Sequence, residues 1–133
     1  LGLNDVCLVG DPAFCLDVPP ETIDRERSKR VKPTLGFNVS PLIRHFRGTE
    51  PEKQRMDEEI VRFIVRVVEE GDMDVLLVSH VDLQDRGEGN SDFDYMERIK
   101  DRCGVVSDRI SMTARLANAL ELKAAIASCK YFI

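Results

Sequence analysis

The chain has 133 residues, of which 43% are hydrophobic and 32% are charged, and its formal net charge is -5 at pH 7. This length and composition are typical of one globular domain with a hydrophobic core, and they exclude a disordered or fibrous chain. The acidic balance argues against a broad nucleic-acid-binding surface, so we predict no nucleic-acid partner.

The sequence also lacks the patterns of membrane, secreted and metal-binding proteins. No hydrophobic run reaches the ~18 to 20 residues of a membrane span, and no signal-peptide pattern opens the chain, so we predict a cytoplasmic protein without a membrane span. The cysteines have no CxxC spacing and no HExxH segment occurs, so we predict reduced, mostly buried thiols, no metal site and no cofactor. These cysteines are Cys7, Cys15, Cys103 and Cys129.

Residues 5–9 (DVCLV) predict a short strand, and the turn that follows it contains Asp11 and Pro12. Asp11 therefore stands at a strand end, where its carboxylate either binds backbone N–H groups of the turn or faces a ligand cleft. Residues 17–33 are polar and contain three prolines, which indicates a linker. We therefore predict that residues 1–16 are the edge of a preceding domain and that the main domain begins at Thr34.

The predicted linker carries a cluster of basic residues. Such a cluster is either a solvated charged surface or a local site for anions. Its members are Arg25, Arg27, Lys29, Arg30 and Lys32.

A strand, a helix and a second strand are predicted within residues 34–81. The first strand is predicted at residues 34–39. The second is predicted at residues 74–79, where a continuous apolar run indicates a strand that is covered on both faces. Between them, Thr49 and Glu52 form a capping box that opens a helix over residues 50–70, and Gly71 follows its end. Hydrophobic residues at spacings of three and four give this helix one apolar stripe. The stripe consists of Met56, Ile60, Phe63, Ile64, Val67 and Val68.

The remaining elements continue the alternation of strands and helices. Residues 93–102 predict a helix, residues 109–112 a strand, and Asn118 with Glu121 a second helix start that resembles a capping box. Residues 130–133 predict a final strand. This alternation predicts an α/β fold with a parallel, Rossmann-like sheet and helices on both faces.

Ligands of such folds bind outside the carboxyl ends of the strands. Asn38 and Ser40 follow one predicted strand, and His80 and Asp82 follow the next, so we predict these four as site residues. His80 is the catalytic candidate, because an imidazole can transfer a proton or bind an anion near neutral pH. A structural histidine, enclosed and hydrogen-bonded, is the alternative. His45, in the basic segment LIRHFRG beside Arg44 and Arg47, either helps to hold a phosphate or carboxylate or belongs to a solvated charged surface.

Five short segments occur in an order that resembles the polysaccharide pyruvyl transferase family. They are DPAF (11–14), GFNVSP (36–41), LLVSH (76–80), FDYMERI (93–99) and ALELKAAIASCKYFI (119–133). The resemblance spans nearly the whole chain. It implies a transferase that moves the pyruvyl group of phosphoenolpyruvate onto a saccharide acceptor, a precursor of a polysaccharide, with no cofactor beyond this donor substrate.

The resemblance also implies a GT-B-like enzyme with two Rossmann-like domains that face a cleft. Residues 1–16 would then end a mostly absent N-terminal domain, residues 17–33 would be the linker, and residues 34–133 would be a truncated C-terminal domain. Family members continue beyond the position of Ile133 with a Gly-x-Arg-x-His segment, so we expect this chain to be a fragment that is inactive alone. Its catalytic residue would be His80, and its substrate contacts would be Asp11, Asn38, Ser40, Arg44 and Asp82.

Two other functions fit the same fold. One is a non-catalytic Rossmann-like module that binds a nucleotide or a nucleotide sugar, and the other is the donor domain of a conventional glycosyltransferase. The sequence does not predict an oligomeric state.

Overall fold

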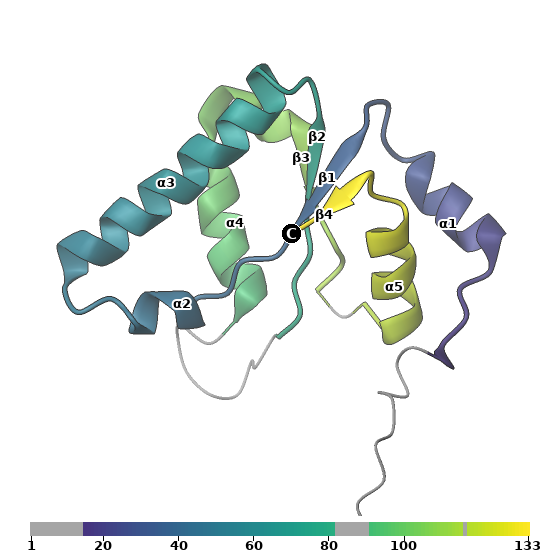
Figure 1. The fold of residues 1–133 in the computed structure, drawn as a ribbon, viewed down its shortest axis with the longest axis horizontal. Coiled ribbons are helices and arrows are strands. Elements are labelled where there is room, and N and C mark those ends of the chain that lie inside the picture. Colours follow the sequence, from purple (N-terminus) through teal and green to yellow (C-terminus); the bar gives the residue numbers. More distant parts are fainter. Residues whose placement is uncertain (1–14, 82–90, 116) are drawn as a thin grey trace, which may run out of the picture.

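A computed structural model describes residues 15–81, 91–115 and 117–133 of the chain. Its centre is a four-stranded sheet in the order β3-β2-β1-β4, and every neighbouring pair of strands is parallel (Figure 1). The strands are β1 (Thr34–Phe37), β2 (Asp74–Leu77), β3 (Ile110–Met112) and β4 (Tyr131–Phe132). The predicted parallel α/β fold is therefore confirmed. The strand predicted at residues 5–9 lies outside the described residues.

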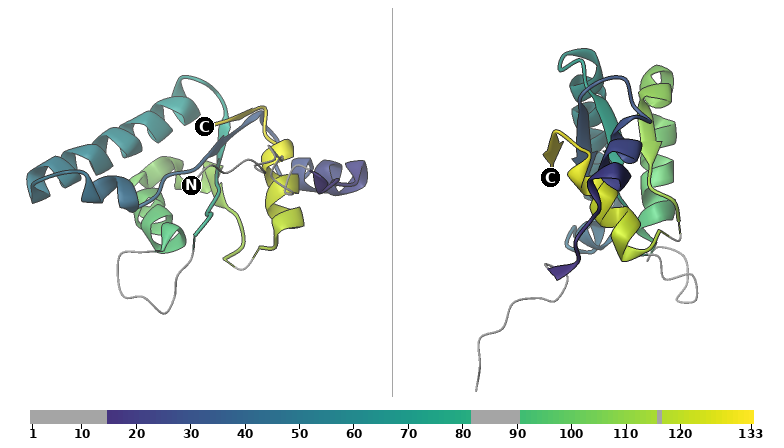
Figure 2. Two further views of the ribbon diagram at one scale, coloured as in Figure 1. Left: turned by 60° about the horizontal axis from the view of Figure 1, so that its bottom comes forward. Right: turned by 90° about the vertical axis from the view of Figure 1, so that its right-hand side faces the viewer.

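Helices cover both faces of this sheet. The helices α3 (Glu50–Glu69) and α4 (Asp92–Arg102) pack on one face, and α5 (Ala119–Ala127) packs on the other (Figure 1). The views of Figure 2 show the same grouping from other directions. Two short elements, α2 (Leu42–His45) and the 3-10 segment η2 (Gly104–Arg109), lie within the connections.

The hydrophobic core has one part on each face of β2. Val75 and Leu77 pack among the residues of α3 and α4, whereas Leu76 and Val78 pack against Ala125 of α5. All four of these residues of the β2 segment are buried. The continuous apolar run in the sequence is therefore explained by helices on both sides of a central strand.

The helix α3 begins and ends close to the predicted residues. The Thr49 hydroxyl accepts a hydrogen bond from the Glu52 backbone N–H at 3.4 Å, and the Glu52 carboxylate accepts one from the Thr49 N–H at 2.9 Å. Gly71 follows the helix because a Cβ atom there would lie only 2.6 Å from the Val67 carbonyl oxygen. Asp72, with φ of 49°, then turns the chain into β2.

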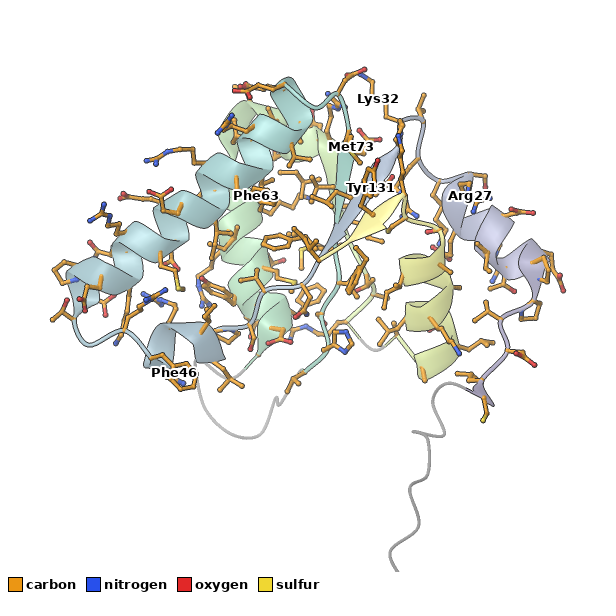
Figure 3. The ribbon with its side chains drawn as sticks, in the orientation of Figure 1. Arg27, Lys32, Phe46, Phe63, Met73 and Tyr131 are labelled. Atoms are coloured by element: carbon orange, nitrogen blue, oxygen red, sulfur yellow. The ribbon has the colours of Figure 1, made fainter. Side chains whose placement is uncertain are left out.

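The predicted apolar stripe of α3 faces the sheet over part of its width. Ile64 and Val68 are buried in the core. Phe63 lies at the border of the stripe and is 39% exposed, and its ring packs against that of Phe37 in β1 with centroids 5.5 Å apart (Figure 3).

Part of the predicted linker, residues 17–33, is helical. It contains the helix α1 (Pro20–Arg27), which packs against α5. Pro20 occupies the first helical turn, where its missing N–H costs no intrahelical hydrogen bond and its fixed φ suits a helix. The prolines that suggested a linker thus mark the start of a helix. The division of the chain into domains at Thr34 stays a prediction.

The strand β4 lies at one edge of the described sheet. It pairs with β1, and among the described residues no strand pairs with its other side. Its approach to β1 requires Gly36, because a Cβ atom there would lie 2.6 Å from Cδ2 of Phe132 and 2.9 Å from Sγ of Cys129. Tyr131 and Ile133 remain more than half exposed, at 55% and 57%.

Candidate functional site

The carboxyl ends of β1 and β2 define the candidate site. The connection from β1 leads to β2 on one side, whereas the connection from β3 crosses to β4 on the other side of β1. In doubly wound sheets the order 3-2-1-4 has its topological switch point between the first and fourth strands, and ligands bind outside the carboxyl ends there. Residues 38–40 leave β1 at this point, and residues 79–81 leave the neighbouring β2.

Asn38 joins three strands at this edge. Its side-chain Nδ2 donates a hydrogen bond to the Val78 carbonyl oxygen at 2.7 Å, and its backbone N–H donates one to the Ile133 carbonyl oxygen at 2.8 Å. The amide group is therefore used, at least in part, to hold the ends of β4, β1 and β2 together.

Ser40 opens the short helix α2. Its Oγ accepts a hydrogen bond from the Leu42 backbone N–H at 3.3 Å, and its carbonyl oxygen accepts one from the Ile43 N–H at 3.2 Å. Because the hydroxyl acts as an acceptor in this contact, its hydrogen is left to donate to a ligand oxygen.

His80 has a fixed backbone and an exposed side chain. It follows the segment 75–79, all of which is buried, and Ser79 is itself held by a hydrogen bond from its N–H to Oγ1 of Thr113 at 3.2 Å. The His80 side chain is exposed, and its ring makes no hydrogen bond or ion pair with any residue that the structure describes. An enclosed structural histidine would look different, because its ring nitrogens would be bonded to the protein.

Asp92 holds the backbone at His80, and sequence reasoning missed it. Its Oδ2 atom accepts hydrogen bonds from the backbone N–H groups of His80 at 3.2 Å and of Val81 at 3.0 Å. Its own N–H donates to the Val81 carbonyl oxygen at 2.8 Å. Asp92 is only 2% exposed although it is charged. The available signal was the pair Ser91-Asp92, a helix-capping serine followed by a carboxylate in the first turn.

Arg44 is directed toward α3. Its NH2 group donates to the Glu50 carboxylate at 3.0 Å, and its Nε lies 3.5 Å from Oδ1 of Asp57. Asp57 is a buried carboxylate that also accepts a hydrogen bond from the Tyr95 hydroxyl at 2.6 Å and lies 3.5 Å from NH1 of Arg102. Arg44 thus belongs to an ionic network between α2, α3 and α4.

The structure brings Asn38 and His80 close in the fold, since Asn38 bonds to Val78, two residues before His80. Ser40 shares the loop of Asn38. The hydrogen bonds and ion pairs of the Arg44 side chain among the described residues go to Glu50 and Asp57 and not to these three. The predicted site residues Asp11 and Asp82 lie outside the described residues.

Three of the five residues of the basic cluster form ion pairs. Arg27 pairs with Asp24, Lys29 with Glu26, and Lys32 with Asp72. Lys32 lies at the end of the sheet where β1 begins, opposite the carboxyl ends (Figure 3). These ion pairs favour the interpretation of the cluster as a solvated charged surface.

The described cysteines do not suggest nucleophilic catalysis. Cys15 is exposed, Cys103 is buried and Cys129 is partly buried, and all three are free. Burial raises the pKa of the Cys103 and Cys129 thiols, which keeps both protonated near neutral pH. Within residues 15–81, 91–115 and 117–133, no three metal-ligating side chains are grouped so that they could hold an ion. None of the helices in these same ranges has both the length and the hydrophobicity needed to cross a membrane.

Of three comparisons with known proteins, one finds a match, and it is to the family that the five sequence segments resemble. Neither the curated proteins nor the solved structures include a significant match to this chain. The family model described as polysaccharide pyruvyl transferase, however, matches residues 1–133, which is the whole chain. The chain therefore belongs to the polysaccharide pyruvyl transferase family.

Proposed function

We propose that this chain takes part in moving a pyruvyl group from phosphoenolpyruvate to two hydroxyl groups of a saccharide acceptor, which forms a pyruvate ketal. Family membership supports the transferase class. The observation that carries the assignment of the site is the exposed imidazole of His80 on a fixed backbone, at the carboxyl edge next to the switch point.

The chemistry needs a group that transfers protons. A proton adds to the methylene carbon of phosphoenolpyruvate, and a sugar hydroxyl oxygen bonds to the neighbouring carbon as it loses its own proton. The oxygen of a second hydroxyl then bonds to the same carbon and displaces phosphate, which leaves with the proton of that hydroxyl, and the ketal is closed. We assign His80 to one of these proton transfers. We assign to Asn38, which bonds to Val78 two residues before His80, and to the Ser40 hydroxyl the donation of hydrogen bonds to the carboxylate or phosphate oxygens.

The donor substrate carries a phosphate and a carboxylate, which require cations or N–H groups. Arg44, Asp11 and Asp82 remain proposed substrate contacts, but Arg44 already lies between the carboxylates of Glu50 and Asp57. We therefore propose that further residues of a longer, two-domain GT-B-like transferase complete the site. On this proposal residues 34–133 belong to its C-terminal domain, and the 133-residue chain alone does not transfer pyruvate.

The test compares the 133-residue chain with the full-length transferase. Each is incubated with phosphoenolpyruvate and saccharide acceptors, and both phosphate release and the mass of the saccharide product are measured. We expect ketal formation by the full-length protein only. Binding of a nucleotide sugar without any ketal product would instead favour a nucleotide-sugar-binding module or a glycosyltransferase donor domain.

The role of His80 is tested in the same assay. His80→Asn and His80→Ala are expected to lower turnover by roughly 10²-fold or more, which is the usual effect of losing a general acid–base group. The melting temperature should change little, because the side chain is exposed and its ring has no bond to the described residues. Gln54→Ala, at an exposed polar position of α3 to which no substrate contact is assigned, serves as the control. A variant at His80 that keeps its rate but melts early would show a structural role instead.

A further inference from the structure

We propose that Asp92 is a positioning residue for His80: its buried carboxylate fixes the backbone from which the imidazole projects. This inference rests on the proposed function of His80. Three hydrogen bonds join residues 80–81 to the start of α4, two of them accepted by Oδ2 of Asp92 and one donated by the Asp92 N–H to the Val81 carbonyl oxygen.

The carboxylate of Asp92 is not needed to cap its own helix. Ser91 is the N-cap residue of α4, and its Oγ accepts the hydrogen bond from the Asp94 backbone N–H at 3.1 Å. The described hydrogen bonds of the Asp92 carboxylate go instead to the segment that leaves β2. Ser91 therefore caps α4, whereas the Asp92 carboxylate binds the backbone that follows β2.

A buried carboxylate is unfavourable unless hydrogen bonds or charges compensate it. Asp92 is 2% exposed, and its Oδ1 atom is buried without a hydrogen bond from the described residues. The first turn of α4 stabilises its negative charge through the helix dipole. The two N–H groups at Oδ2 stabilise the carboxylate further, so the carboxylate and the segment 80–81 hold each other in place.

His80 is thereby fixed on both sides. On one side the buried β2 segment reaches Ser79, whose N–H is bonded to Thr113. On the other side Asp92 holds the N–H of Val81. The ring itself has no hydrogen bond or ion pair with the described residues, so among them only the backbone of residues 79–81 limits the region that the ring can occupy. Rates of proton transfer depend steeply on such placement, because a displacement of about 1 Å can cost about 10²-fold.

The backbone role is tested first, without any substrate. Amide resonances of His80 and Val81 are compared by nuclear magnetic resonance in the 133-residue chain and in Asp92→Ala, Asp92→Asn and Asp94→Ala. In Asp92→Ala we expect the amide protons of residues 80 and 81 to lose hydrogen-bonded shifts and to exchange with solvent about tenfold faster. Asp92→Asn retains an acceptor oxygen and should keep most of the protection. Asp94→Ala, which removes a charge from the same helical turn, is the matched control.

The catalytic consequence is tested in the full-length transferase. We expect Asp92→Ala to lower kcat roughly 10- to 100-fold while the KM for phosphoenolpyruvate changes much less, because the residue does not touch substrate. Asp92→Asn should recover most of kcat. If Asp92→Ala does not fold, Asp92→Glu takes its place, since it keeps the charge but moves the oxygens by one methylene group.

Two results would overturn the inference. One is unchanged amide exchange at residues 80 and 81 in Asp92→Ala. The other is an Asp92→Ala enzyme that melts earlier but retains the wild-type kcat, which would leave Asp92 a purely structural role. Failure of the proposed function would be seen separately, because the wild-type full-length protein would then form no ketal. The amide measurements need no substrate, so they would still decide whether Asp92 holds the His80 backbone.

Discussion

At the scale of single residues, the pair of Tyr95 and Asp57 shows how the helices on one face are held together. Tyr95 is 1% exposed, and its hydroxyl donates a 2.6 Å hydrogen bond to the buried Asp57 carboxylate. Burial, together with the neighbouring Asp57 charge, raises the pKa of the Tyr95 hydroxyl well above its ordinary value of 10.0. The folded protein therefore keeps the Tyr95 proton at a pH where the unfolded chain releases it.

This difference predicts a loss of stability in alkali. Below about pH 10 both states hold the Tyr95 proton, so the contribution to folding is complete. Above that pH the unfolded chain binds fewer protons than the folded protein, and the free energy of unfolding falls by up to about 1.4 kcal/mol per pH unit from this group. Urea unfolding between pH 8 and about pH 11.5 measures the slope.

Tyr95→Phe is the control for that slope. It removes the titrating hydroxyl and leaves Asp57 with one donor fewer, so at pH 8 it should lower the free energy of unfolding by about 1 to 3 kcal/mol. Its decline above pH 10 should be shallower than that of the wild type. Equal slopes for the two proteins would show that Tyr95 titrates alike in both states.

At the scale of elements, the helix α3 depends on both its cap and its buried stripe. Ile64 is fully buried at 0% exposure, in the cluster that includes Val75 and Leu77 of β2. We expect Ile64→Ala to lower the free energy of unfolding by roughly 2 to 4 kcal/mol, through lost burial and the cavity that remains. Arg62→Ala, at a neighbouring exposed position, should change it by less than about 0.5 kcal/mol. Thermal or urea unfolding measures both, and equal effects would refute the predicted packing.

The elements that the sequence predicts well are those with local signals. The capping boxes at Thr49 and Asn118 are present in the structure, and the continuous apolar run of β2 is buried on both faces. The helix α1 was missed because it buries none of its residues fully, so it has no apolar stripe to recognise. Its start at Pro20 was visible but resembled a linker proline.

The candidate site was predicted less completely, for a physical reason. The position of a residue after a strand is a local property, and it is the basis on which the sequence proposes Asn38, Ser40 and His80 as site residues. The partners of these residues are not local: Asp92 reaches back 12 residues to His80, and Asn38 reaches 40 residues to Val78. Arg44 stays a proposed substrate contact, and its ion pairs with Glu50 and Asp57 of α3 depend on how α2 packs beside α3, which the local sequence does not specify.

At the scale of the whole molecule, the order of the strands decides where the site lies. The sequence predicts four parallel strands but not their neighbours, since sequence periodicity carries no information about which strands pair. The order β3-β2-β1-β4 places the loops after β1 and β2 side by side and puts β4 on the far side of β1. The switch point next to Asn38 is a property of this arrangement and of no single residue.

The side of β4 that is not paired within residues 15–81, 91–115 and 117–133 has a consequence for how the chain behaves in solution. Unpaired backbone groups beside apolar side chains act as a template on which a strand of another molecule can add. We expect the average mass of the 133-residue chain, measured by light scattering, to rise between micromolar and millimolar concentration. Tyr131→Lys should suppress this rise, because charged residues protect sheet edges, whereas Val31→Lys, at an exposed position outside the sheet, should not. A mass that is independent of concentration would show that the edge does not recruit neighbours. If the mass does rise, the free side of β4, opposite the side that pairs with β1, also sets an upper limit on the concentration at which this chain stays monodisperse.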